Sequence, residues 1–324
     1  MRAATALLGA FLAVVASCAA AFSETPTIRI AVLKFGTVNW ELNTIKFHQL
    51  DAERGFSLDI KGMAGGPAAR VALQGGEADM IVADWLWVAR QRAAGKDYVF
   101  IPYSKSVGGL MIPADSKATT LADLAGSKIG IAGGPLDKSW LILNAYASKM
   151  HGIDLKNETE QVFGAPPLIF KTALSGDLDG AINYWHFTAK MEAGGMRKLI
   201  STSDAAEALG LDPDMPLLGY VIDGKLLRDN PGLVENFTGA SRAAKAILAE
   251  DDGEWDRLRD VMKAKSDGQF EALKAGFRAG IPAAGPVDED SARRMFNLMS
   301  ELAGEELVGK ATELPDGIFV NPGS

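Results

Sequence analysis

Cysteine, histidine and long apolar runs are all scarce in this sequence. Its 324 residues include one cysteine and three histidines, which lie at positions 48, 151 and 186. The cysteine, Cys18, lies in an apolar N-terminal segment, so the rest of the chain has no disulfide, no cysteine metal site and no cysteine nucleophile. Three scattered histidines argue against a metal site or histidine-based catalysis. Basic residues are also in deficit, 33 against 41 acidic ones, which argues against a nucleic-acid partner.

The first 21 residues follow the pattern of a secretory signal peptide. A basic start is followed by a nearly continuous apolar run over residues 3–16 and by alanines at 19–21 that suit cleavage. We therefore expect a periplasmic protein, cleaved near Ala21. Residues 15–18 also fit a lipobox, in which Cys18 would carry a lipid, and this alternative stays open. The chain has no second apolar run that predicts a membrane span.

Two stretches one hundred residues apart repeat one pattern. Residues 76–87 and 176–185 both read Gly-x-x-Asp, then a short apolar run, then a tryptophan, so that Trp85 pairs with Trp185. Trp40 and Trp140 share the same offset. The repeat predicts two similar α/β lobes, each presenting a tryptophan-bearing loop to a shared cleft.

Short apolar strands alternate with helical segments through the first two thirds of the chain. This alternation predicts an α/β fold with a mostly parallel sheet in each lobe. We place lobe one at residues 24–108 and 219–324, and lobe two at residues 109–218, with the chain crossing between them twice. After residue 230 we expect helices that pack on the outside of lobe one, and then an irregular, exposed tail from Leu314.

Ligands of open α/β sheets bind beyond the carboxyl ends of the strands. The candidate ligand-binding residues are therefore those in the loops that follow the predicted strands: Lys34, Phe35, Asn39, Trp40, Gly65, Gly66, Asp84, Trp85, Gly133, Gly134, Asp137, Ser139, Trp140, Asn183, Tyr184 and Trp185. His186 borders the last of these loops, either as a packing residue or as a ligand contact.

The side chains in these loops suggest a class of ligand. Indole faces beside the Asp84 carboxylate suit an amine, another cation or a hydrogen-bonding heteroaromatic ring, with Trp85 and Trp185 stacking on it. Core packing is the alternative for each tryptophan and is favoured for Trp87, while Asp137 could equally be a helix cap. Glycine pairs at 65–66 and 133–134 leave backbone N–H groups that suit an anion. No phosphate-loop or dinucleotide motif occurs, so no cofactor is expected.

Several motifs, taken in order, resemble one protein family. Ile-Arg-Ile-Ala-Val at 28–32, Gly65-Gly66 before a helix, Gly-Glu-Ala-Asp at 76–79 and Thr-Leu-Ala-Asp-Leu-Ala-Gly at 120–126 look like the nitrate/taurine/sulfonate-type substrate-binding proteins of bacterial ABC importers. The resemblance covers roughly residues 26–250. It implies a type II periplasmic-binding fold, in which two α/β lobes are joined by two crossover strands and C-terminal helices lie on lobe one.

The resemblance also implies a function. A monomeric, non-enzymatic binder would capture a small molecule between its lobes and deliver it to a permease and its ATPase in the inner membrane. This chain has Gly-Pro-Leu-Asp at 134–137, where oxyanion-binding members tend to offer a small hydroxyl residue. That departure favours a larger, partly aromatic or amine-containing ligand over nitrate or a simple sulfonate. The alternatives are the ligand-binding subunit of a periplasmic sensor and, less favoured, an enzyme on the same fold.

Overall fold

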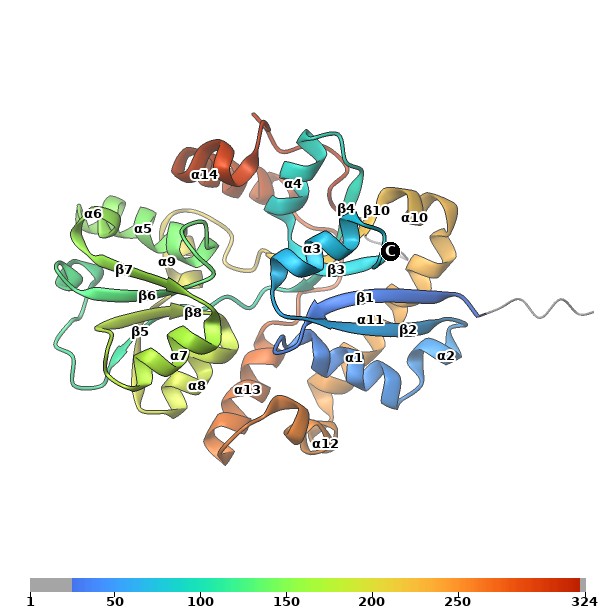
Figure 1. The fold of residues 1–324 in the computed structure, drawn as a ribbon, viewed down its shortest axis with the longest axis horizontal. Coiled ribbons are helices and arrows are strands. Elements are labelled where there is room, and N and C mark those ends of the chain that lie inside the picture. The colour runs from blue at the N-terminus through green and yellow to red at the C-terminus, as the bar shows by residue number, and fades with distance from the viewer. Residues whose placement is uncertain (1–24, 321–324) are drawn as a thin grey trace, which may run out of the picture.

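Two five-stranded sheets organise the computed structural model, which describes residues 25–320 (Figure 1). The sheet of lobe one has the order β2-β1-β3-β10-β4, and the sheet of lobe two has the order β7-β6-β8-β5-β9. Lobe one contains β1 (Thr27–Leu33), β2 (Ser57–Met63), β3 (Met80–Asp84), β4 (Tyr98–Ser104) and β10 (Leu218–Asp223). Lobe two contains β5 (Gly109–Pro113), β6 (Lys128–Ala132), β7 (Glu160–Gly164), β8 (Gly180–Asn183) and β9 (Met196–Ser201).

The two sheets share one topology. In each, the first three strands are parallel, and an antiparallel strand that has crossed from the other lobe pairs beside them. β5 crosses into lobe two directly after β4, and β10 crosses back after β9. Two mixed α/β sheets with two crossings are the predicted fold class. The exact residue limits given above for the lobes remain a prediction, and the predicted signal peptide with Cys18 lies outside the described residues.

The repeated Gly-x-x-Asp motif has the same structural role in both lobes. The Asp79 carboxylate accepts a hydrogen bond from the backbone N–H of Arg29 at 2.8 Å, and Asp179 accepts one from the backbone N–H of Lys128 at 2.7 Å. Each aspartate thereby fixes the start of a central strand. Asp79 and Asp179 therefore lie at the opposite end of the strands from the loops that are predicted to bind a ligand.

Helices cover both sheets. Lobe one carries α1 (Val38–Phe47), α2 (Leu50–Glu53), α3 (Gly66–Gln74) and α4 (Trp85–Ala93). Lobe two carries η1 (Leu121–Leu124), α5 (Lys138–His151), α6 (Leu155–Glu158), α7 (Pro166–Leu174), α8 (Trp185–Ala193) and α9 (Thr202–Ala208). The C-terminal part forms α10 (Gly224–Asp229), α11 (Pro231–Glu250), α12 (Asp252–Met262), α13 (Asp267–Ala279) and α14 (Glu289–Val308). No helix among residues 25–320 is long and apolar enough to cross a membrane.

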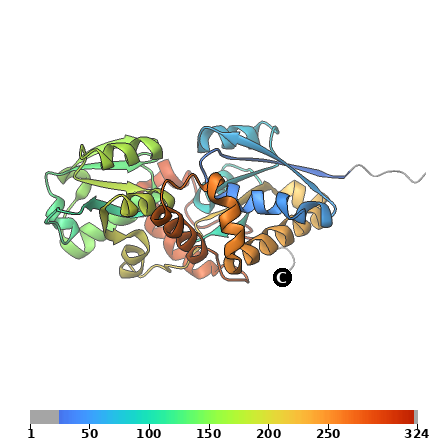
Figure 2. The ribbon, with the colours of Figure 1, turned by 90° about the horizontal axis from the view of Figure 1, so that it is seen from below.

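The C-terminal helices contact both lobes, whereas the sequence predicted packing on lobe one alone. α13 packs against α8 of lobe two, and α14 packs against α4 of lobe one and α5 of lobe two. Figures 1 and 2 show these helices bridging the space between the lobes rather than covering only lobe one. The predicted exposed tail is wrong over residues 314–320, because Ile318 is buried and Phe319 forms a β-bridge with Phe100, and its last four residues lie outside the described range. Local sequence patterns do not report such contacts between distant segments.

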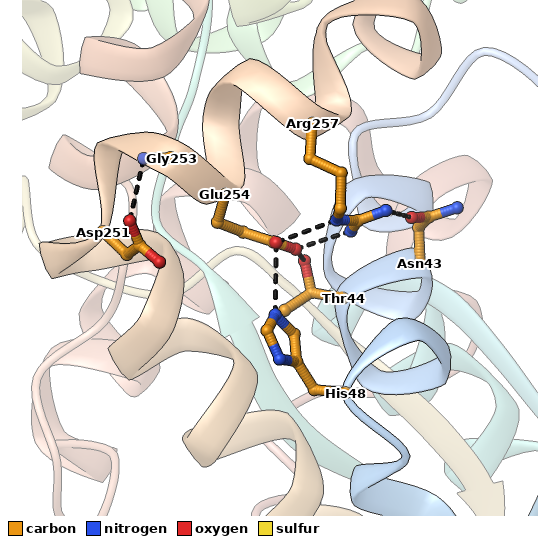
Figure 3. Close-up of polar contacts among 7 residues, drawn as sticks. All are labelled: Asn43, Thr44, His48, Asp251, Gly253, Glu254 and Arg257. Atoms are coloured by element: carbon orange, nitrogen blue, oxygen red, sulfur yellow. Dashed lines mark hydrogen bonds and ion pairs between the residues drawn. The ribbon is translucent and has the colours of Figure 1, made fainter.

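A buried carboxylate joins α12 to α1 (Figure 3). The Glu254 carboxylate accepts hydrogen bonds from the Thr44 hydroxyl at 2.5 Å and from Arg257 Nη2 at 2.6 Å, and it lies 3.2 Å from His48 Nε2. Arg257 in turn donates to Asn43 Oδ1 at 2.6 Å. Burial acts to raise the pKa of Glu254, but these hydrogen bonds outweigh it and lower the pKa to about 2. These contacts, which centre on the Glu254 carboxylate, therefore hold α12 against α1 of lobe one. We call them the Glu254 clamp.

Replacing this carboxylate should destabilise the protein in a pH-dependent way. Glu254→Gln is expected to lower the free energy of unfolding at pH 7 on the order of 2 kcal/mol, because it removes hydrogen bonds to a charged group. The native pKa lies below the ordinary value of 4.5, so the contribution is present above that pH and is lost as the pH falls toward about 2.

Denaturant unfolding at several pH values measures this difference, with Glu235→Gln on the exposed side of α11 as the control. A deficit for Glu254→Gln that is equally large at pH 2 and pH 7 would contradict the assignment.

Candidate functional site

A cavity of about 390 Å³ lies between the two lobes. Lobe one supplies the loop after β1 and part of α1, lobe two supplies α8, and the end of α12 forms a third side. The residues that line it are Lys34, Phe35, Gly36, Asn39, Trp40, Asn43, Lys46, Ile60, His186, Phe187, Lys190, Val261, Met262 and Lys263. A molecule in this cavity would touch both lobes at once.

Four predicted site residues line this cavity, and all four come from the loop after β1 and the start of α1. Asn39 donates two hydrogen bonds within the loop, to the carbonyl oxygens of Leu33 and Gly36 at 2.8 and 2.7 Å. The shape of the loop therefore depends on Asn39. The other three predicted residues that line the cavity are Lys34, Phe35 and Trp40. The Phe35 ring meets Phe187 of lobe two with 6.3 Å between ring centres.

A second group of predicted residues joins the lobes through charge. Asp84 ends β3 in lobe one, and its Oδ2 atom accepts from Lys138 Nζ of lobe two at 3.1 Å and from Arg70 Nη2 at 3.3 Å. Its Oδ1 atom caps α4 by accepting from the Trp87 N–H at 2.9 Å. Burial acts to raise the pKa of Asp84, but Lys138 and Arg70 outweigh it and lower that pKa. The carboxylate is thus already paired with two cations.

Asp137 and Tyr184 lie beside one another at the carboxyl ends of β6 and β8. Asp137 accepts from the Trp140 N–H at 3.1 Å, so the helix-cap role that the sequence allowed is present. Burial raises the pKa of Asp137 to about 6. Burial, then the charges of Asp137 and Asp84, raise the pKa of Tyr184 to about 12, so its hydroxyl stays protonated. A Cβ atom on Gly133 would lie 3.3 Å from both side chains, which explains glycine at this position.

The tryptophans have different surroundings in the two lobes. Trp85 is 0% exposed and contacts Phe319 with 5.7 Å between ring centres, so its face is covered in this structure. Trp140 is also buried. The Trp87 ring stacks on the Tyr98 ring with 5.5 Å between ring centres, which agrees with the packing role expected for Trp87. Trp185 is half-buried, and its ligand role, like that of Trp85, stays a prediction.

Trp185 inserts from lobe two into lobe one. Its ring meets Trp40 edge to face, with 5.9 Å between ring centres. On α13, a Cβ atom on Gly276 would lie 2.6 Å from Trp185 Cζ3, so only glycine leaves room for the indole. The Gly276 carbonyl also accepts from the Ser106 hydroxyl at 3.1 Å, in the crossover between β4 and β5. α13 therefore contacts both the crossover and lobe two.

The remaining predicted residues have local roles. Asn183 is buried, donates to the Pro166 carbonyl at 2.9 Å and accepts from the Tyr184 N–H at 2.8 Å. The others do not line the cavity: Gly65, Gly66 and Ser139 lie at helix N-termini, and Gly134 lies in the loop before α5. Their contact with a ligand stays a prediction. Among residues 25–320 no group of three or more metal-ligating side chains could hold a metal ion.

Sequence reasoning missed the residues that α8 and α12 contribute. Lys190, Val261, Met262 and Lys263 lie in or directly after helices, not in loops at strand ends, so the strand-end rule does not select them. His186, which the sequence left open between packing and contact, is 7% exposed and lines the cavity. Burial, then the charge of Lys190, lowers the pKa of His186 to about 3, so the ring is neutral.

Two crossed α/β lobes with a cavity between them define a protein of the type II periplasmic-binding fold. Solved structures share it over most of their length. The alkanesulfonate-binding protein SsuA of Xanthomonas axonopodis pv. citri, bound to MOPS, has a TM-score of 0.70 at 18% identity, over 91% of this chain and 98% of that one. The aliphatic sulphonate binding protein SsuA of Escherichia coli has a TM-score of 0.73 at 17% identity, over 91% and 92%. The Candida albicans CA3427 gene product, with a generic periplasmic binding protein fold, has a TM-score of 0.59 at 13% identity, over 92% and 97%.

The chain belongs to the family described as NMT1/THI5 like, whose model matches residues 52–254. No curated protein sequence matches it. The family resemblance drawn from the sequence motifs and the predicted fold class are both confirmed.

Enlarging Gly276 should separate the lobes. Gly276→Ala places a methyl group against the Trp185 ring, so the indole must leave its site and become more exposed to water. We expect greater acrylamide quenching of tryptophan fluorescence and a larger radius of gyration by small-angle X-ray scattering.

Gly268→Ala on the same helix is the matched control, because its new Cβ would have no neighbour nearer than Ser266 Oγ at 3.9 Å. Equal quenching in both variants would show that Trp185 does not hold the lobes together.

Proposed function

We propose that this protein is the periplasmic substrate-binding component of an ABC importer, acts as a monomer and is not an enzyme. The observation that carries the proposal is the cavity between the lobes, whose lining comes from both of them. A ligand that contacts both lobes stabilises the closed arrangement over the open one. The permease and its ATPase would then recognise the closed form. The sulfonate-binding names of two solved structures with this fold support the same role.

The lining supports a small organic ligand with an aromatic or apolar part. Phe35, Trp40 and Phe187 provide rings, and Ile60, Val261 and Met262 provide aliphatic surface. The amine-containing ligand suggested by Asp84 has less support, because that carboxylate is already paired with Lys138 and Arg70. An apolar ligand group packed against the contacting rings of Phe35 and Phe187 would touch both lobes.

The first test is to identify what the protein carries. Protein isolated from the periplasmic fraction is expected to hold one small molecule per chain by native mass spectrometry, and that molecule should rebind after its removal. Isolation from the cytoplasm, or failure of any fraction to carry or rebind a small molecule, would contradict the proposal.

The second test is to remove one ring from the cavity. Phe35→Ala should weaken binding of the copurified molecule about two- to tenfold, since one aromatic contact contributes about 0.5–1.5 kcal/mol. Isothermal titration calorimetry measures the change. Phe163→Ala, which removes a 40% exposed ring on β7, serves as the control. If both variants bind like the natural protein, the ligand does not occupy this cavity.

A further inference from the structure

A buried ion pair lies at the start of α1, directly after the loop that lines the cavity. The Glu41 side chain of α1 is fully buried, and its Oε2 atom lies 2.7 Å from Lys245 Nζ of α11. Its Oε1 atom accepts hydrogen bonds from the hydroxyl groups of Tyr220 on β10 and Ser241 on α11, both at 2.6 Å. Lys245 also donates to Ser241 Oγ at 2.7 Å. One carboxylate therefore joins α1, β10 and α11.

Two tyrosine rings extend this network to the cavity loop. Lys245 Nζ lies 4.9 Å from the centre of the Tyr103 ring and 5.6 Å from the centre of the Tyr220 ring, and a cation is attracted to such ring faces. The hydroxyl groups of Tyr103 and Thr37 share a hydrogen bond at 3.4 Å. Because Thr37 lies in the loop between β1 and α1, the network reaches the segment that lines the cavity.

The same tyrosines lie on the two strands that border the crossings between the lobes. Tyr103 is near the end of β4, directly before the chain first crosses to lobe two, and Tyr220 is in β10, directly after the chain returns. The two rings contact each other edge to face, with 5.4 Å between ring centres. The network thus joins the cavity loop to both strands at which the chain leaves or enters lobe one.

A pair of charges adds geometry rather than stability at this place. Apolar residues of similar volume often stabilise a fold as well as a buried ion pair does, because burial removes both charges from water. Burial lowers the pKa of Lys245, whereas the charge of Glu41 acts to raise it. Burial, then the charge of Glu41, raises the pKa of Tyr103 and of Tyr220 well above the usual value, so both hydroxyl groups stay protonated. Hydrogen bonds to a charged group are short and directional, so they specify one position.

Both parts of α1 are held by buried carboxylates. The Glu254 clamp holds the later part, through Thr44 and His48 (Figure 3). Glu41 does the same for the first turn, which carries the cavity residue Trp40. A shift of this turn would therefore change the shape of the cavity.

We propose that Glu41 and Lys245 are positioning residues, whose ion pair holds the loop at residues 34–37 and the first turn of α1 in the arrangement that lines the cavity. Neither residue lines the cavity, so both act through the loop and the turn. The inference rests on the proposed function in that this loop is a part of lobe one that contacts the ligand. The loop should therefore loosen when the pair is removed, even where overall stability is kept.

Amide hydrogen exchange measures the order of the loop directly and needs no ligand. The backbone N–H groups of Asn39 and Trp40 donate hydrogen bonds within this segment, at 3.2 and 3.0 Å, so they exchange slowly while the loop is ordered. Exchange in a peptide that covers residues 34–40 is followed by mass spectrometry, after any bound molecule has been removed. Thermal unfolding of the same samples gives the Tm.

Three variants separate position from stability. Lys245→Met leaves Glu41 buried without its cation. Glu41→Gln combined with Lys245→Met removes both charges and keeps an acceptor for Tyr220 and Ser241. Val234→Ala is the control, because Val234 is buried on the same helix but lies about 16 Å along the helix axis from Lys245. It lowers stability by leaving a small cavity, away from the ion pair.

We expect Lys245→Met to lower the Tm by about 5–10 °C, because a buried charge is left unpaired, and to speed exchange in the loop about tenfold. The double variant should melt near the natural protein. Its loop should still exchange faster, because a neutral amide accepts weaker hydrogen bonds than a carboxylate. Val234→Ala should lower the Tm and leave exchange in the loop unchanged, because the loop exchanges by local opening.

Loop exchange that is as slow in the double variant as in the natural protein would overturn the inference, because the pair would then contribute stability alone. An equal rise of loop exchange in Val234→Ala would also overturn it, because the loop would then follow overall stability. If Lys245→Met does not fold, the double variant still decides, since it has no unpaired buried charge.

Failure of the proposed function has a different result. A protein that carries no small molecule can still show a loop that depends on the ion pair. A protein that binds a small molecule and has a loop insensitive to Lys245 keeps its role as a binder and loses only these positioning residues.

Discussion

The contact of Trp185 with Trp40 and Gly276 sets the distance between the two lobes, and the cavity between them depends on that distance. The indole comes from the first turn of α8 in lobe two and enters an aromatic group of lobe one that also includes Trp255 and Phe277. Glycine on α13 gives it room. Because Trp185 is next to His186 and on the same helix as Lys190, the same insertion places the lining of the cavity that belongs to lobe two.

Charge and apolar packing have separate roles at the boundary between the lobes. The Asp84 carboxylate pairs with Lys138 of lobe two and with Arg70 of lobe one, so this ion pair joins the lobes at the strand ends. Lys190 of α8 contacts the end of α12 by donating to the Met262 carbonyl oxygen at 3.4 Å. On this account the indole insertion fixes the geometry, and a ligand that contacts both lobes determines how strongly the closed form is populated.

Local sequence features predicted the sheets well, because the central strands β3, β6 and β8 are short, largely apolar runs that follow glycine turns, and β2 alternates apolar and polar residues. The Gly-x-x-Asp repeat reflects a shared structural role. Asp79 and Asp179 accept hydrogen bonds from backbone N–H groups at the starts of equivalent strands. The repeat did not show that Trp85 and Trp185 have different surroundings. Phe319, from the end of the chain, covers Trp85, whereas α13 receives Trp185.

The cavity lysines could not be predicted either. Lys190 lies in α8 and Lys263 directly follows α12, and the packing of α13 on α8 places both at one cavity. The strand-end rule did find the loop from Lys34 to Trp40, because that loop follows a central strand. It also placed Asp84 and Asp137 at helix starts, where both act as caps. Residues placed by long-range contacts of the C-terminal helices were the ones that sequence reasoning missed.

The most direct test of this account is a crystal structure of the protein with its copurified ligand. The account predicts a closed protein in which the ligand occupies the cavity and contacts both Phe35 of lobe one and Phe187 of lobe two. A ligand bound entirely within one lobe, or outside this cavity, would contradict it.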